Sequence, residues 1–283
     1  MKKKILIPTD FSKNAWNAVT YAADLFKDQE CTFYLVNSYV IDGYPIGDIN
    51  AAEFGETSFD KARKISGDGL NKILEMLKLR NTNYDHNYNI LTEYGDPISV
   101  IKSVIDKNDI DLVVMGTKGE NNRSGALFGS NTITAMDEVR NCPVMSVPLE
   151  AIPKEIKEIV FPTSYSSNYK SRELLHLVQI AIAYNANICV LHVSPEDSLS
   201  ETKERNKQML SECLEGANYS FHHISGSKRN LAVRNFVESR DSDMIAMVNR
   251  KHAFFEKIFA TPMLKELGMF SHVPLLAMHD LHN

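Results

Sequence analysis

The sequence lacks the features that mark membrane proteins, secreted proteins and zinc proteins. Among its 283 residues, no apolar run approaches the roughly 20 residues that a membrane-spanning helix needs. The opening MKKKILIPTD has an apolar stretch far too short for the core of a signal peptide. The four cysteines are widely separated and form no CxxC pair, which argues against zinc and thioredoxin-type motifs. We therefore expect a cytoplasmic protein with no membrane partner.

An excess of charge and the common catalytic motifs are missing as well. The formal net charge of −5 gives no reason to expect nucleic acid as a partner. Adjacent histidines His222 and His223 would face opposite sides of a strand, and the other histidines are scattered, so no metal site is expected. There is no GxSxG elbow, and spacing assembles no Ser–His–Asp set, so no catalytic residue is expected.

What the chain does contain is a glycine-rich stretch, MGTKGENNRSGALFGSN, at residues 115–131. It lies between a β-branched run and a helical pattern. Glycine costs backbone entropy on folding, so such a cluster tends to persist where the backbone adopts positive φ or approaches something closely. Two interpretations are open. The stretch is either a flexible surface loop or an anion cradle, in which backbone N–H groups and a helix N-terminus point at phosphates.

The chain also repeats itself. KKILIPTDFSKNA (3–15) is similar to KEIVFPTSYSSNY (157–169), and DLVVMGTKG (111–119) is similar to DMIAMVNRK (243–251). The repeat predicts two domains of ordinary size, residues 1–150 and 151–283, joined within PLEAIPKEI. The second half is shorter, mostly because it lacks a counterpart of residues 40–60. That excursion either covers a site or decorates the first half.

Strand and helix patterns alternate in the first half. The predicted strands are 4–8, 31–38, 86–92, 111–115 and 143–147; the predicted helices are 13–27, 58–80 (interrupted by GDG at 67–69), 97–107 and 130–140. This alternation favours an α/β fold, with a parallel sheet covered by helices on both faces. Ligands of such sheets bind beyond the C-terminal ends of the strands. Asp10, Asn37 and Gly116 follow three such ends and are expected to converge.

The loop spacing Gly116-x2-Gly119-x9-Gly129-Ser130 matches neither the P-loop pattern nor GxGxxG. Together with PTDFS after the first strand and with the repeat, it resembles the universal stress protein family in its tandem two-domain form. The resemblance implies two Rossmann-like domains of the adenine-nucleotide alpha hydrolase type, each an open five-stranded parallel sheet flanked by helices. It also implies an ATP-binding stress-response protein that holds the nucleotide in the first domain, with or without Mg²⁺.

The resemblance implies a set of nucleotide-binding residues: Pro8, Thr9, Asp10, Asn37, Met115, Gly116, Gly119, Gly129, Ser130 and Asn131. In this interpretation Gly116 and Gly119 let the backbone turn close to the phosphates, and Ser130 either caps the following helix or donates to a phosphate. Asp10 either caps the first helix or contacts the nucleotide, directly or through a divalent ion. Asn37 would meet the adenine or ribose through its backbone.

The second half departs from this pattern. Ser164 stands where the first half has Asp10, and Val248 where it has Gly116. Valine disfavours positive φ and would crowd an approaching phosphate. The sequence therefore predicts that the second domain keeps the fold without binding ATP.

Other functions remain open at this stage. A slow ATPase or self-phosphorylating protein is one, although a P-loop lysine, an evident second acidic metal ligand and an obvious base are missing. A scaffold that binds no nucleotide, and a different phosphate ligand such as cyclic AMP, are others. In this family the last strands of two domains pair, so 143–147 and 274–278 are expected to pair antiparallel and form an intramolecular pseudo-dimer. A homodimer of chains also remains open.

Overall fold

The computed structural model describes residues 2–41, 56–80, 85–118, 128–196, 198–226, 228–249 and 272–279. The strands are β1 (Lys3–Pro8), β2 (Cys31–Tyr39), β3 (His86–Tyr94), β4 (Leu112–Gly116), β5 (Val144–Val147), β6 (Glu158–Thr163), β7 (Asn187–Val193), β8 (Asn218–Ile224), β9 (Met244–Asn249) and β10 (Leu275–His279). The helices are α1 (Lys13–Leu25), α2 (Glu56–Leu79), α3 (Pro97–Asn108), α4 (Ser130–Glu138), α5 (Ser171–Tyr184), α6 (Glu201–Cys213) and α7 (Arg229–Arg240).

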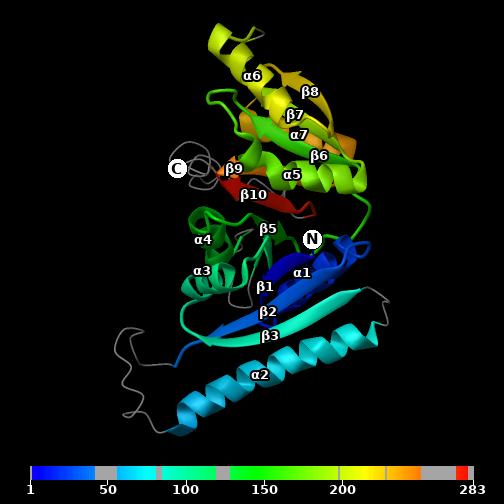
Figure 1. Cartoon of the computed structure of the whole chain (residues 1–283). Coiled ribbons are helices and arrows are strands. Elements are labelled where there is room, and N and C mark those ends of the chain that lie inside the picture. Colours follow the sequence, from blue (N-terminus) through cyan, green and yellow to red (C-terminus); the bar gives the residue numbers. More distant parts are fainter. Residues whose placement is uncertain are drawn as a thin grey trace.

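The strands form one ten-stranded sheet in the order β3-β2-β1-β4-β5-β10-β9-β6-β7-β8 (Figure 1). Within each half, the five strands run parallel. The halves meet where β5 pairs antiparallel with β10, with Leu275 opposite Ser146. The predicted α/β fold with five parallel strands in each half is confirmed, and the predicted pairing of the two last strands is present.

Helices cover both faces of the sheet, and each face has its own apolar core. Ile5 and Ile7 of β1 belong to the core under α1, α2, α5 and α6, whereas Leu6 belongs to the core under α3, α4 and α7. All three side chains are fully buried. Burial on both faces explains why central strands such as β1, β4, β7 and β9 are nearly continuous apolar runs, whereas the edge strands β3 and β8 carry polar residues.

Helix α2 differs from the prediction because it continues through GDG without interruption. A Cβ atom on Gly69 would overlap the Phe11 ring, whereas one on Gly67 would lie 3.9 Å from its nearest neighbour, Thr92. Gly69 therefore makes room for the Phe11 ring and does not end the helix. The helix tolerates each glycine at a cost of about 1 kcal/mol relative to alanine. The other predicted boundaries are within two residues of the observed ones.

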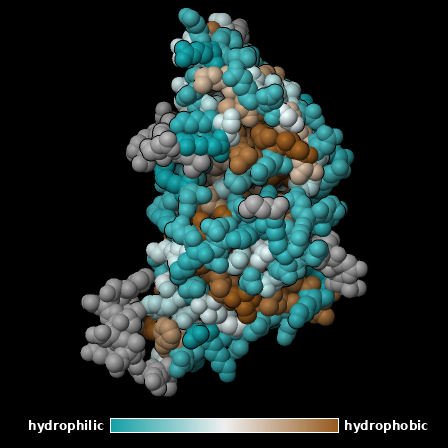
Figure 2. Space-filling model, in the orientation of Figure 1, coloured by the Kyte–Doolittle hydropathy of each residue, from teal (hydrophilic) through white to brown (hydrophobic). Residues whose placement is uncertain are grey.

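The visible face of the molecule is mainly hydrophilic (Figure 2). Apolar side chains gather on it over α5, where Leu175 and Ile182 are 48% and 55% exposed. None of the helices in the described ranges is long and apolar enough to cross a membrane. All four cysteines are free thiols, and Cys31 and Cys189 are buried in strands. Most of the predicted excursion, residues 42–55, lies outside the described residues.

Candidate functional site

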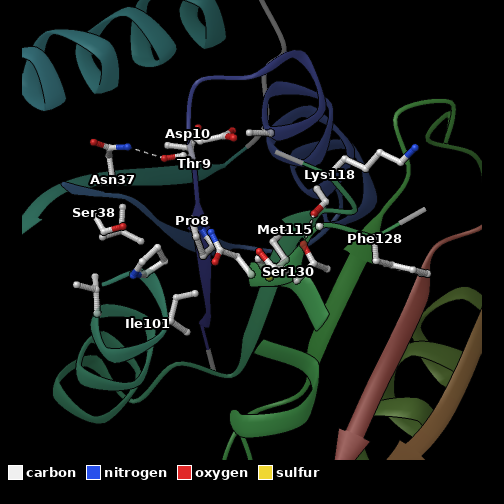
Figure 3. A pocket seen from close by; sticks show the side chains of 18 residues that line it. Pro8, Thr9, Asp10, Asn37, Ser38, Ile101, Met115, Lys118, Phe128 and Ser130 are labelled. Carbon is white, nitrogen blue, oxygen red and sulfur yellow. Dashed lines mark hydrogen bonds between the residues drawn. The ribbon is translucent and has the colours of Figure 1, made fainter. Parts of the chain in front are cut away.

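A cavity of about 410 Å³ lies in the first half, where β1, β2 and β4 end and α3 and α4 begin (Figure 3). This volume falls within the range of small-molecule sites. The residues that line it are Pro8, Thr9, Asp10, Ala15, Val36, Asn37, Ser38, Pro97, Val100, Ile101, Met115, Gly116, Lys118, Phe128, Gly129, Ser130, Asn131 and Thr132.

Nine of the ten sequence-predicted site residues line this one cavity. The tenth, Gly119, lies outside the described residues. Sequence reasoning missed the wall contributed by α3, which consists of Pro97, Val100 and Ile101. The signal for it was present in Gly-Asp-Pro directly after the third strand, since Asp before Pro is a helix start and places the helix N-terminus at the same sheet edge.

The ends of β1 and β2 are tied together by hydrogen bonds. The Thr9 N–H donates to the Val36 carbonyl at 2.9 Å, and Nδ2 of Asn37 donates to the Thr9 carbonyl at 2.7 Å (Figure 3). The Asn37 side chain is buried in this contact. One of its two amide N–H groups is therefore occupied within the protein, which is compatible with a ligand contact through the Asn37 backbone.

Asp10 does not cap α1, so that interpretation is wrong. The cap is Ser12, whose Oγ accepts from the Ala15 N–H at 3.1 Å. Oδ1 of Asp10 instead accepts from the Ser12 N–H at 3.1 Å, and the residue is exposed at the cavity. Within the described lining, Asp10 is the single acidic residue. It can therefore face a ligand or a ligand-bound cation.

The N-terminus of α4 opens into the cavity without a side-chain cap. The N-cap is Gly129, at φ −70° and ψ 156°, so Ser130 is the first helical residue and the interpretation of Ser130 as the cap is wrong. No acidic residue lies in the first turn, and Lys118 also lines the cavity. Unpaired N–H groups, the positive end of the helix dipole and a lysine together favour an anion.

Gly116 lacks the positive φ that the loop motif suggested, and it makes a close contact with α1 while also lining the cavity. Its φ is not positive; among the described residues, the glycines with positive φ are Gly95, Gly216 and Gly226. A Cβ atom at Gly116 would lie 2.9 Å from Cγ of Asn14 and 3.0 Å from the Asn14 backbone. The glycine is therefore required by the close approach of α1. Oγ1 of Thr132 also donates to the Gly116 carbonyl at 2.8 Å, which ties α4 to β4.

The corresponding strand ends in the second half carry a group of aromatic rings. His192 is the counterpart of Asn37, because Leu191 pairs with Pro162 as Val36 pairs with Pro8, and each of the two residues comes next in its strand. Nδ1 of His192 lies 2.9 Å from the Thr163 carbonyl oxygen. The centroid of the His192 ring lies 4.8 Å from that of Tyr165 and 5.6 Å from that of His223. Only 4% of His192 is exposed. These rings pack together at the C-terminal ends of β6, β7 and β8.

His192 is expected to make the protein less stable in acid. Burial lowers the pKa of His192 below its usual value, with help from nearby Lys203, His223 and Arg229 and against the bond to Thr163. The unfolded chain then binds more protons below pH ~6.5, so the free energy of unfolding falls as pH falls through that range. In urea unfolding at pH 7 and pH 5, His192→Asn should lose less stability than the wild type. An equal loss in both proteins would contradict this assignment.

Comparison with known proteins finds both sequences and structures that are similar to this chain. A family model described as "Universal stress protein family" matches residues 1–148. A universal stress protein of Methanocaldococcus jannaschii is 30% identical over 149 residues, which cover 51% of this chain and 81% of the relative. A universal stress protein structure from Archaeoglobus fulgidus has a TM-score of 0.71 at 17% identity, covering 97% of this chain and 95% of that one. A putative universal stress protein structure from Pseudomonas aeruginosa has a TM-score of 0.56 at 14% identity, covering 98% and 93%. At these identities, the two structures support the fold alone.

Proposed function

The chain belongs to the universal stress protein family, and from this premise we propose that it is an ATP-binding regulatory protein of the stress response. The observation that carries the proposal is the uncapped N-terminus of α4, which faces a cavity lined by nine of the ten residues that the family resemblance implies. In this proposal, the bound state rather than turnover carries the signal, because the described lining holds one carboxylate and no histidine.

The lining fits an adenine nucleotide in two parts. Apolar side chains from three elements (Val36, Ile101 and Met115) form one wall and suit a base or ribose. The N–H groups at the start of α4, the Ser130 hydroxyl and Lys118 suit the phosphates. Asp10 supports a Mg²⁺ ion carried by the nucleotide, since Mg²⁺ in such sites needs only one or two carboxylates beside phosphate oxygens and water.

The division of labour between the halves is part of the same proposal. Residues 1–150 form the nucleotide-binding domain, and residues 151–283 form a domain that does not bind ATP, which Val248 in the place of Gly116 supports. Pairing of β5 with β10 supports an intramolecular pseudo-dimer. Further association into a homodimer belongs to the proposal as well. Free cysteine thiols support a reducing cytoplasm as its compartment.

Thermal unfolding with and without Mg-ATP tests the proposal. Ligand at about 100 times Kd stabilises the native state by about 2.7 kcal/mol, so about 1 mM Mg-ATP should raise Tm by several degrees if Kd is about 10 μM. Mg²⁺ alone should not reproduce the shift. An unchanged Tm at millimolar Mg-ATP would overturn the proposal for ATP.

A further inference from the structure

Asn14, on the first turn of α1, is not part of the cavity wall but contacts the loop that leads to it. Its Nδ2 donates to Oγ1 of Thr117 at 3.1 Å and to the Lys118 carbonyl at 3.2 Å. Asn14 is 6% exposed and Thr117 is 5% exposed, so the first of these contacts is shielded from water. One buried amide thus holds two consecutive residues directly after β4.

These bonds continue to the N-terminus of α4. The Thr117 carbonyl accepts from the Gly129 N–H at 2.6 Å, and Gly129 is the N-cap of α4. Asn14 therefore contacts both sides of the glycine-rich stretch. It binds Lys118 directly, and it binds Thr117, which in turn holds Gly129. Lys118 and Gly129 both line the cavity, on the side where the phosphates are proposed to lie.

The second half shows what happens when this arrangement is absent. In the first half, Gly116 lets α1 approach, and α1 starts at Lys13, five residues after Pro8. In the second half, Val248 takes the place of the glycine, and α5 starts at Ser171, nine residues after Pro162. The helix thus begins about one turn later, since a turn is about 3.6 residues. The two hydrogen bonds from the Asn14 amide to Thr117 and Lys118, which we call the clamp, thus occur in the half that has the glycine.

We propose that Asn14 is a positioning residue that sets the distance between the phosphate-facing groups and the rest of the site. This inference rests on the proposed function and adds a residue that the family motif does not include. It has a specific consequence for ligand choice. A nucleotide with a phosphate chain depends on the clamp, whereas a nucleoside held at the ends of β1 and β2 does not.

The test is calorimetric titration of the full chain with Mg-ATP and with adenosine. Asn14→Ala should weaken Mg-ATP binding by about tenfold and leave adenosine binding within about twofold of the wild type. Thr117→Val, which removes one acceptor at nearly constant volume, should weaken Mg-ATP in the same direction by a smaller factor. The matched control is Asn17→Ala, on the same helix, whose amide instead donates to the carbonyls of Pro148 and Ala151.

Two results would overturn the positioning role: equal losses for Mg-ATP and adenosine, or no loss for either ligand in Asn14→Ala. If the wild type binds no Mg-ATP, the proposed function fails separately. The clamp is then judged by amide hydrogen exchange in the ligand-free protein. Faster exchange at Gly129 in Asn14→Ala than in Asn17→Ala supports the clamp, and equal exchange overturns it.

Discussion

Replacing Gly129 by aspartate is expected to weaken ATP binding about a hundredfold or more and to stabilise the ligand-free protein. The extended backbone at Gly129 suits an N-cap aspartate, whose carboxylate would accept from an N–H of the first turn of α4. The gain over glycine is a few tenths of a kcal/mol. The same carboxylate would meet the phosphates, and repulsion at this range should weaken Mg-ATP binding by about two orders of magnitude or more. Calorimetric titration and urea unfolding measure the two effects.

Lys228→Asp is the matched control for this substitution. Lys228 is the N-cap of α7, has a similar extended backbone (φ −61°, ψ 130°) and makes no side-chain cap bond. An aspartate there should stabilise the protein by about 0.5–2 kcal/mol, more than at Gly129 because lysine does not cap, and leave Mg-ATP affinity unchanged. If Gly129→Asp keeps wild-type affinity, the phosphates do not lie at the N-terminus of α4, and the proposed site is wrong in that part.

Much of the fold could be predicted because its signals are local. Apolar runs and helical spacing alternate along the chain, and the repeat of PT at the end of the first strand of each half supplies the two-part organisation. The positions of Asp10, Asn37 and Gly116 around one cavity followed from the rule that parallel strands end at the same edge of a sheet. No contact had to be known to reach these conclusions.

The roles of individual glycines could not be predicted, because they depend on residues distant in sequence. Gly116 makes room for Asn14, and Gly69 makes room for Phe11. A glycine that permits positive φ and a glycine that permits a close contact look identical in the sequence. The contacts between the rings around His192 could not be predicted either, since the rings come from three separate segments that only the folded sheet brings together.

Gly116→Val, which introduces the residue that the second half carries, is expected to destabilise the ligand-free protein. The Cβ atom alone would come within 3.0 Å of the Asn14 backbone, which a side-chain rotation cannot relieve. Overpacking of this kind costs about 1–3 kcal/mol. Urea unfolding without nucleotide should show a lower midpoint with little change in slope. A loss of Mg-ATP affinity should accompany the change, because the start of α1 and its Asn14 amide must move.

The control is a glycine whose surroundings are open. Gly67→Ala in α2 places a Cβ atom 3.9 Å from its nearest neighbour, an ordinary contact, and should stabilise the protein by about 0.5–1 kcal/mol through the helix. The free energy of unfolding should rise on substitution of Gly67 and fall on substitution of Gly116. This difference in sign separates the effect of steric overlap from the effect of losing a flexible residue. If Gly116→Val is as stable as the wild type but binds Mg-ATP weakly, the glycine serves the ligand directly, as the loop motif first indicated. If it loses stability in the absence of nucleotide, the packing of α1 on β4 selects glycine at this position whether or not a phosphate binds.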